Sequence, residues 1–149
     1  MINHYIKCEV LDGGSLPQKA HTSDAGYDLF ASSDISLEPG EILKHPLNIK
    51  LHLPENCYME ITSKSGNGIK GLLVYAGIID EAYRGVINVI ATNISNNTLT
   101  FKKNQKVAQL IYHPYTKYTS IVQVDKIDEN TERGTGAFGS SGSFKKEQL

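Results

Sequence analysis

Turn-forming residues divide this sequence into short segments, and that division is the strongest constraint on its fold. Residues 48–53 and 57–62 alternate polar and apolar side chains, which is the pattern of strands buried on one face. No stretch of ten or more residues shows the 3.6-residue apolar period of a helix, and only residues 66–70 suggest a helical turn. We therefore predict an all-β sandwich, jelly roll or barrel.

Further strands are predicted from similar short runs bounded by Gly, Pro, Asn or Asp. They are residues 4–10, 25–31, 72–75, 86–92, 98–101, 107–113 and 120–124. A length of 149 residues is that of one domain. After residue 125 the composition becomes polar and glycine-rich, so we predict a β domain at 1–125 and a flexible C-terminal arm at 126–149.

The charged residues nearly cancel, with 15 basic and 16 acidic side chains. Such a balance provides no bulk field for nucleic acid or an anionic membrane surface. No apolar run is long enough to span a bilayer, and no signal peptide follows Met1. Cys8 and Cys57 are isolated, which argues against zinc sites and disulfides and fits a reducing compartment. We expect a cytoplasmic protein that binds neither nucleic acid nor membrane.

Residues 77–85 contain the strongest candidate for a catalytic group. A short apolar run ends at Asp80, Tyr83 follows, and glycines bracket the segment. The pattern predicts a strand entering a tight hairpin, with Asp80 and Tyr83 at or near the bend. A carboxylate beside an apolar strand end is a candidate general base, because partial desolvation raises its pKa toward the working pH. An ordinary turn aspartate is the alternative interpretation.

Two glycine-rich segments have the composition of nucleotide-binding loops. Residues 63–71 combine serine hydroxyls, lysines and glycines, which can bind phosphate oxygens, although the spacing is not that of a Walker A loop. Residues 133–142 place Arg133 five residues before Phe138, with two serines after it. Arginine can bind phosphate and phenylalanine can stack on a base, so this segment has the composition of a lid. A plain surface loop and a disordered tail are the respective alternatives.

Five segments, taken together and in this order, resemble the motifs of the trimeric, all-β dUTP pyrophosphatases (dUTPases). They are residues 25–29, 63–66, 77–85, 104–111 and 133–142. The resemblance implies a distorted jelly-roll, or β-clip, barrel. It implies a homotrimer whose active sites each use more than one chain, with the C-terminal tail closing over a site. The implied reaction is Mg2+-dependent hydrolysis of dUTP to dUMP and pyrophosphate.

The resemblance also implies roles for single residues. Asp80 would activate the water that attacks the α-phosphorus, and the Tyr83 ring would pack under the deoxyribose and exclude a 2′-hydroxyl. Asp28 would hold Mg2+ through its water shell. The implied substrate-binding residues are the phosphate ligands Lys64, Ser65, Gly66 and Gln109, the uracil-reading segment with Val74, Gly77 and Ile79, and the tail residues Arg133, Phe138, Gly139, Ser140 and Ser141.

The chain departs from the family pattern at three of these places. Lys64 stands where the family has an arginine, so a point charge replaces a bidentate fork. Ala137 stands where a second glycine is frequent, and Ser141 where threonine is common. One alternative function is a dCTP deaminase or a bifunctional deaminase of the same superfamily, for which Glu81 would be the glutamate near the cytosine amino group. Another is an additional nucleotide-gated regulatory role with an unidentified protein partner.

Overall fold

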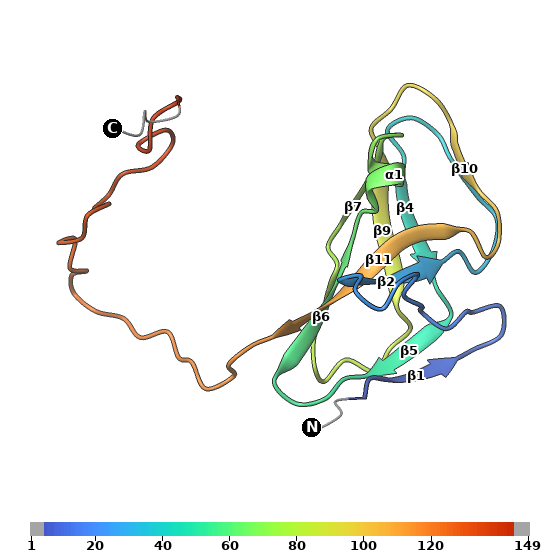
Figure 1. Ribbon diagram of the computed structural model, residues 1–149, viewed down its shortest axis with the longest axis horizontal. Helices are drawn as coiled ribbons and strands as arrows, with labels where there is room; N and C mark the ends of the chain where they lie inside the picture. The colour runs from blue at the N-terminus through green and yellow to red at the C-terminus, as the bar shows by residue number, and fades with distance from the viewer. Residues whose placement is uncertain (1–4, 145–149) are drawn as a thin grey trace. The chain divides into compact units, whose positions relative to one another are not determined.

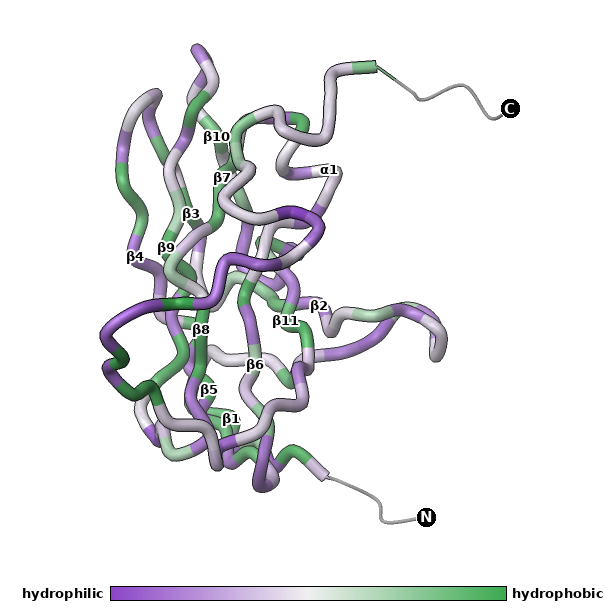
Figure 2. Tube along the Cα trace, turned by 90° about the vertical axis from the view of Figure 1, so that its left-hand side faces the viewer, coloured by the Kyte–Doolittle hydropathy of each residue, from purple (hydrophilic) through white to green (hydrophobic). Residues whose placement is uncertain are grey.

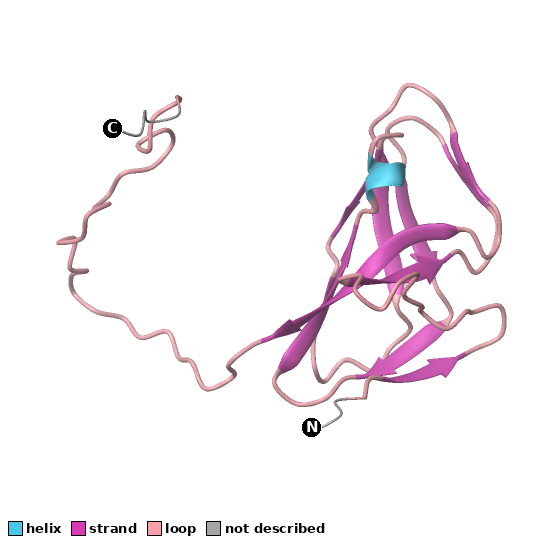
Figure 3. Ribbon diagram, viewed as in Figure 1, coloured by secondary structure: helices cyan, strands magenta, loops and turns pink. Residues whose placement is uncertain are grey.

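The computed structural model of the chain describes residues 5–144. Within them the chain forms eleven strands and one four-residue helix (Figure 3). The prediction of an all-β protein is confirmed. His4, the first residue of a predicted strand, lies outside the described residues. No helix within residues 5–144 has the length and apolar character needed to cross a bilayer.

The strands pair in an antiparallel manner and form four small sheets. In chain order the elements are β1 (Lys7–Val10), β2 (Gly26–Phe30), β3 (Ile35–Leu37), β4 (Ile42–Pro46), β5 (Ile49–His52), β6 (Cys57–Thr62), α1 (Ser65–Gly68), β7 (Leu72–Tyr75), β8 (Ile78–Ile79), β9 (Asn88–Asn93), β10 (Leu99–Phe101) and β11 (Lys106–Pro114). The strand orders are β1-β5, β10-β3, β2-β11-β6-β8 and β4-β9-β7.

β11 is the centre of the largest sheet. It pairs with β2 on one side and with β6 on the other, and Figure 1 labels all three strands. Gln109 of β11 lies opposite Asp28 of β2 and opposite Thr62 of β6. Three motifs that are distant in the sequence are therefore brought to one end of the same sheet.

The hydrophobic core takes its side chains from all four sheets. Along β6 burial alternates as predicted, with Cys57, Met59 and Ile61 buried and the residues between them partly exposed. Each fully buried Leu, Ile or Met contributes about 1.5–3 kcal/mol relative to an exposed side chain. β8 is hydrophobic along its length (Figure 2), with Ile79 buried and Ile78 exposed.

Two strands, β3 and β4, were not predicted from the sequence. β3 has only three residues, too few to show an alternating pattern, and it pairs with β10. β4 ends at Pro46, a residue that argues against a strand because it lacks a backbone N–H. β4 lies at the edge of its sheet beside β9, where a proline is tolerated.

The chain divides into two compact units, Met1–Lys117 and Tyr118–Leu149. All strands of the described range lie in the first unit. The predicted strand at residues 120–124 is wrong, since this segment pairs with no described strand and Ile121, Val122 and Val124 are exposed. The segment has the pattern of a strand, but a strand requires a neighbour for its backbone groups. The predicted domain boundary after residue 125 stays a prediction.

The tight hairpin predicted around Asp80 is also wrong. β7 pairs with β9, but the chain between them leaves this sheet, and β8 pairs with β6 instead. Gly77 lets the chain pass from the sheet of β7 to the sheet of β6 and β8 close to the β6 backbone, because a Cβ atom there would lie 2.0 Å from the carbonyl oxygen of Ile61. The Gly77 carbonyl accepts a hydrogen bond of 2.7 Å from the Ile61 N–H. The bend itself is present, since the Tyr83 N–H donates to the Asp80 carbonyl at 3.0 Å.

His45 of β4 is a buried histidine in the first unit. Its Nε2 atom accepts a hydrogen bond of 3.1 Å from the Ser32 N–H, and the Ser32 hydroxyl donates to the Pro46 carbonyl at 2.6 Å. A nitrogen that accepts from an N–H must be unprotonated, so the folded protein holds the neutral ring. Burial lowers the pKa of His45 below its ordinary value of 6.5.

We predict that the protein loses stability as the pH falls below 6.5, the ordinary pKa of histidine, toward the lower pKa of folded His45. In this window the unfolded chain binds a proton at His45 that the folded chain does not bind, so acid favours unfolding. Urea unfolding of wild type and His45→Gln at pH 7.5 and pH 5.5 measures the effect. The wild type should lose more stability between the two pH values than His45→Gln, whereas the exposed His52→Gln should behave as wild type. Equal losses in all three proteins would contradict the assignment.

Candidate active site

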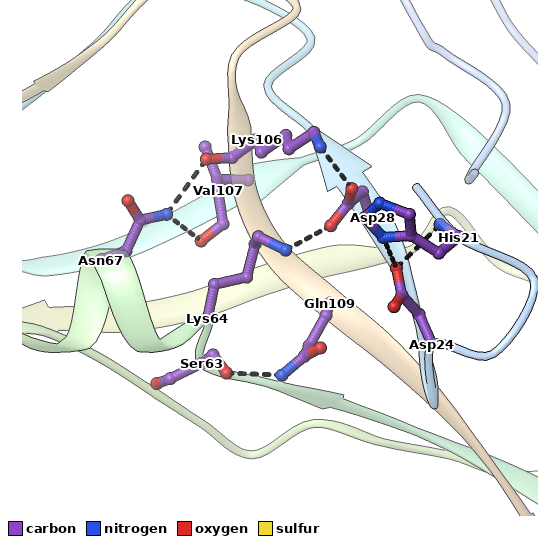
Figure 4. Close-up of polar contacts among 9 residues, drawn as sticks. All are labelled: His21, Asp24, Asp28, Ser63, Lys64, Asn67, Lys106, Val107 and Gln109. Atoms are coloured by element: carbon purple, nitrogen blue, oxygen red, sulfur yellow. Dashed lines mark hydrogen bonds and ion pairs between the residues drawn. The ribbon is translucent and has the colours of Figure 1, made fainter. Parts of the chain in front are cut away.

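The first candidate group lies where β2, the start of α1 and β11 meet. It consists of Asp28, Lys64 and Lys106, and we call it the lysine–carboxylate group (Figure 4). Asp28 is 5% exposed. The ammonium of Lys64 contacts its Oδ1 atom, and that of Lys106 lies 2.7 Å from Oδ2. Burial acts to raise the pKa of Asp28, but hydrogen bonds and charge from Lys106 and Lys64 outweigh it and hold the pKa below its usual value.

Gln109 connects this group to the neighbouring strands. Its Nε2 atom donates to the Ser63 carbonyl at 2.9 Å (Figure 4). Its Oε1 atom lies so close to Gly26 that a Cβ atom there would be only 2.6 Å away. The Ser63 hydroxyl in turn accepts a hydrogen bond of 3.0 Å from the Val74 N–H. Gln109 is thus fixed at the junction of β2, β11 and the loop after β6.

Helix α1 begins directly after Lys64, as the sequence suggested for this region. The Lys64 carbonyl accepts hydrogen bonds of 3.0 and 2.8 Å from the N–H groups of Asn67 and Gly68. Ser65 and Gly66 are exposed on the surface next to the lysine–carboxylate group. Their predicted contacts with phosphate stay predictions.

The second candidate group surrounds the turn from Asp80 to Tyr83. Both side chains line a hollow of about 310 Å3, which we call the Asp80 hollow. Its lining residues are Lys44, Ala76, Ile78, Ile79, Asp80, Tyr83, Val86, Asn88 and Ile90. Asp80 is exposed, so residues 5–144 of a single chain do not supply the apolar cover that the sequence pattern led us to expect.

Tyr83 is held in a defined orientation beside Asp80. Its hydroxyl donates a hydrogen bond of 3.1 Å to the Val86 carbonyl. Its ring lies over Gly85, where a Cβ atom would be 2.4 Å from the Tyr83 hydroxyl oxygen. Any larger residue at position 85 would therefore displace the ring. Tyr83 as a whole remains 43% exposed.

The three residues predicted to read uracil lie in different surroundings. Ile79 is buried and lines the Asp80 hollow. The Val74 N–H is bound to the hydroxyl of Ser63, and the Gly77 carbonyl is bound to the N–H of Ile61. These two backbone groups already have partners in the protein. A direct role for them in base recognition stays a prediction.

Glu81 binds residues outside the Asp80–Tyr83 turn. Its carboxylate accepts hydrogen bonds from the Lys117 ammonium at 3.0 Å and from the Asn56 N–H at 2.8 Å, and the Tyr115 hydroxyl lies 3.4 Å away. The hydrogen bond from Lys117, followed by that from Asn56, lowers the pKa of Glu81. Glu81 does not line the Asp80 hollow but a neighbouring one of about 240 Å3, to which Asp80 and Ile78 also contribute. It anchors the turn that carries Asp80.

The two candidate groups are separated within one chain. Asp28 of β2 lies opposite Gln109 of β11, which lies opposite Thr62 of β6. Asp80 directly follows Ile79 of β8, which pairs with Met59 near the other end of β6. Asp28 and Asp80 are separated by three strand spacings of about 4.8 Å across the sheet and by about four residues of 3.3 Å along the strands. Combined, these two separations place them roughly 20 Å apart. One chain therefore presents two half-sites rather than one complete constellation.

The predicted tail residues all belong to the second unit. The Nε atom of Arg133 donates a hydrogen bond of 2.9 Å to the Gly136 carbonyl, and the Gly136 N–H donates to the Arg133 carbonyl at 3.0 Å. Phe138 has a positive φ of 48° and a fully exposed ring. The other predicted tail residues are also exposed; they are Gly139, Ser140 and Ser141.

Comparison with known proteins decides the family. The sequence model of the dUTPase family matches residues 12–142. The chain belongs to the dUTPase family. A relative in Alkaliphilus metalliredigens, named deoxyuridine 5′-triphosphate nucleotidohydrolase, is 38% identical over 145 residues, which cover 95% of this chain and 99% of the relative.

Solved dUTPase structures have the same fold. A mutant dUTPase of Staphylococcus bacteriophage 80alpha with dUpNHpp superposes with a TM-score of 0.85 at 26% identity, covering 93% of this chain and 99% of the phage chain. A mutant dUTPase of phage phi11 of S. aureus superposes with a TM-score of 0.75 at 23% identity, covering 82% of this chain and 97% of the phage chain. The phi11 protein coordinates a structural Mg(II) ion. The distorted jelly-roll prediction thus agrees with the dUTPase neighbours.

The described residues of this dUTPase do not offer Mg2+ a cage of their own. Within residues 5–144 no group of three or more His, Cys, Asp or Glu side chains could hold a metal ion. Asp28, the one residue for which we expected a metal contact, has an ammonium group on each carboxylate oxygen. The donor set does not fit a metal held by the chain alone. A contact of Asp28 with the water shell of a metal stays a prediction.

Three residues of this dUTPase that lie in the two groups were not predicted from the sequence. Lys106 precedes an alternating strand and looks like an ordinary surface lysine, although it lies within the fourth motif. Lys44 and Asn88 line the Asp80 hollow but lie on β4 and β9, and no family motif contains them. The pairing of β4 with β9 brings them there, and this pairing has no local signal in the sequence.

Proposed function

We propose that this chain hydrolyses dUTP to dUMP and pyrophosphate, as its membership of the dUTPase family indicates. One observation carries the assignment of roles. The turn from Asp80 to Tyr83 holds a carboxylate and an aromatic face on the same hollow. A nucleoside triphosphate hydrolase needs a proton acceptor for water beside a surface that fixes the nucleoside.

In the proposed reaction the Asp80 carboxylate accepts a proton from water. The water oxygen forms a bond to the α-phosphorus, the bond from that phosphorus to the bridging oxygen of the β-phosphate breaks, and pyrophosphate leaves. The Tyr83 ring packs under the deoxyribose. Its hydroxyl already donates to the Val86 carbonyl, so it has no proton to offer a 2′-hydroxyl, and the ring leaves no room for one.

Lys64, Ser65, Gly66 and Gln109 bind the phosphates in this proposal. Two lysines surround one carboxylate, so the lysine–carboxylate group carries a net positive charge that attracts a polyphosphate. The adjacent exposed Ser65 and Gly66 provide a hydroxyl and backbone N–H groups. Mg2+ is the cofactor of the family, and in our proposal it arrives bound to the triphosphate.

A second chain supplies the half-site that each chain lacks. The separation of roughly 20 Å between Asp28 and Asp80 supports a site shared between subunits of a homotrimer. Three exposed apolar side chains of the β4-β9-β7 sheet support a subunit contact at that face; they are Ile42, Leu73 and Tyr75. Ile42 and Leu73 lie opposite Thr92, and Tyr75 lies opposite Ile90, two residues along β9. An unpaired apolar sheet face of this kind is typical of an interaction surface.

The tail closes the site in our proposal. Phe138 stacks on uracil, while Arg133, Gly139, Ser140 and Ser141 hold the γ-phosphate. The exposed Phe138 ring and the positive φ of 104° at Gly139 support a segment that can rearrange around a ligand. A cytoplasmic location and a regulatory protein partner are further predictions from the sequence.

Deamination of dCTP is not favoured by the geometry. That reaction requires a glutamate at the nucleobase, and Glu81 is instead bound to Lys117 and to the Asn56 N–H, outside the Asp80 hollow. An assay of ammonia release from dCTP separates the two reactions.

Asp80→Asn should lower the kcat for dUTP by about 10²–10⁴-fold, because an amide cannot accept the proton of the attacking water. Pyrophosphate release measures kcat, and calorimetry with dUpNHpp measures binding, which should change little. Asp34→Asn is the matched control, since it removes an exposed carboxylate that pairs with Lys102 and lines neither hollow, and it should retain turnover within a few fold. Unchanged turnover in Asp80→Asn would exclude this residue as the proton acceptor.

Mixing two impaired variants tests whether each site is shared between chains. Lys64→Met removes a proposed phosphate ligand from one half-site, and Asp80→Asn removes the base from the other. In randomly mixed trimers roughly one quarter of the sites would pair an intact Asp80 with an intact Lys64 from a neighbour. The refolded 1:1 mixture should therefore be far more active than the two variants assayed separately. If it shows only the sum of their activities, both half-sites come from the same chain.

Removing residues from Arg133 onward should leave the fold intact, because all described strands end by Pro114. The melting temperature should change little, while kcat/KM for dUTP falls at least about tenfold through loss of charge-assisted phosphate contacts. A finer pair compares Phe138→Ala with Phe144→Ala, two exposed phenylalanines of which only the first lies in the motif. Normal activity of the truncated protein would refute the lid.

A further inference from the structure

β11 begins with an irregularity that changes the side to which Lys106 points. Gln109 lies opposite Asp28 and Ala108 opposite Leu29, so a regular ladder would place Val107 opposite Phe30. Instead Lys106 lies opposite Phe30, and Val107 is an extra residue in a β-bulge. Phe30 and Asp28 are two residues apart and share one face of β2. The bulge therefore moves Lys106 from the opposite face onto the face of Asp28.

Asn67 of α1 stabilises this bulge. Its side-chain amide donates hydrogen bonds of 3.0 Å to the Lys106 carbonyl and 3.2 Å to the Val107 carbonyl (Figure 4). Carbonyl groups around a bulge are left outside the regular ladder, and buried carbonyls need a partner. The Asn67 side chain thus joins helix α1, which follows Lys64, to the bulge that directs the Lys106 side chain toward Asp28.

The two lysines do not have equivalent positions. Lys64 immediately precedes the exposed Ser65 and Gly66, and a rotation of its side chain would carry the ammonium to an anion bound there. Lys106 is set by the bulge to face Oδ2 of Asp28, and its backbone carbonyl is held by Asn67. Asp28 is 5% exposed, and a buried carboxylate that loses its counterions is strongly destabilised.

We infer that Lys106, aimed by Asn67, is the resident counterion of Asp28 that frees Lys64 to bind the triphosphate. The inference rests on the proposed function, in which Lys64 is a phosphate ligand. When Lys64 turns from Asp28 to a phosphate oxygen, Lys106 remains on the carboxylate. Without Lys106, the same movement would leave Asp28 buried and unpaired. Lys106 is therefore a positioning residue, which acts on substrate binding through Asp28 and Lys64.

The test compares Lys106→Met, which keeps the length of the side chain and removes its charge, with wild type. Because Lys64 must now serve both Asp28 and the phosphates, the Kd for dUpNHpp and the KM for dUTP should rise about tenfold or more. The kcat should stay within about threefold, since the Asp80 hollow is untouched. Lys106→Arg restores the charge and should restore both binding constants.

Lys102→Met is the matched control. It removes an ion-paired lysine from the turn before β11, where Lys102 faces Asp34 at 2.9 Å and is largely exposed. Equal effects of Lys102→Met and Lys106→Met would show that only net charge matters and would overturn the inference. Wild-type Kd and KM in Lys106→Met would overturn it as well.

Asn67→Leu provides a second test should Lys106→Met fail to fold. It keeps both lysines and removes only the amide that holds the bulge, so the Kd for dUpNHpp should rise by a smaller factor with kcat unchanged. A wild-type Kd in Asn67→Leu would overturn the inference. If the wild-type protein itself neither binds dUpNHpp nor hydrolyses dUTP, the proposed function fails; if it does both and these variants behave as wild type, only the role of Lys106 fails.

Discussion

The architecture of this protein depends on one buried carboxylate held between two ammonium groups. Asp28 comes from β2, Lys64 from the loop after β6 and Lys106 from the start of β11. A carboxylate that is almost fully removed from water needs its charge partners, so the three segments must meet at one end of the sheet. Because two ammonium groups face one carboxylate, the group carries a net positive charge.

The combination of polar–apolar alternation, short β-branched runs and flanking turn residues made most of the strands predictable. It was misleading at residues 120–124, where the pattern is present but the described chain offers no neighbouring strand. It was uninformative at β3, which is too short to alternate. Pairing between distant strands, such as β4 with β9, depends on tertiary contacts and is invisible in a local window.

The bend that carries Asp80 and Tyr83 was predictable from the sequence, but the geometry of the candidate site was not. Asp80 and Tyr83 do lie at one bend, as the sequence indicated, yet the strand before them belongs to a different sheet from the strand after them. Lys106 could not be predicted, because its direction depends on a one-residue bulge held by the amide of Asn67. Bulges of this kind change the facing of side chains without changing the hydrophobic pattern.

Gly77 approaches β6 so closely that mutational tolerance in residues 77–85 reflects chain packing as well as chemistry. A Cβ atom at Gly77 would collide with the Ile61 backbone, and one at Gly85 with the Tyr83 hydroxyl. A saturation scan would therefore record Gly77 as being as intolerant as Asp80, whereas substitutions at Gly85 would act by displacing the Tyr83 ring. The constraint at Gly77 arises from backbone crowding and the one at Gly85 from contact with a side chain, so packing accounts for both glycines, while the chemistry proposed for the third motif is concentrated in Asp80 and Tyr83.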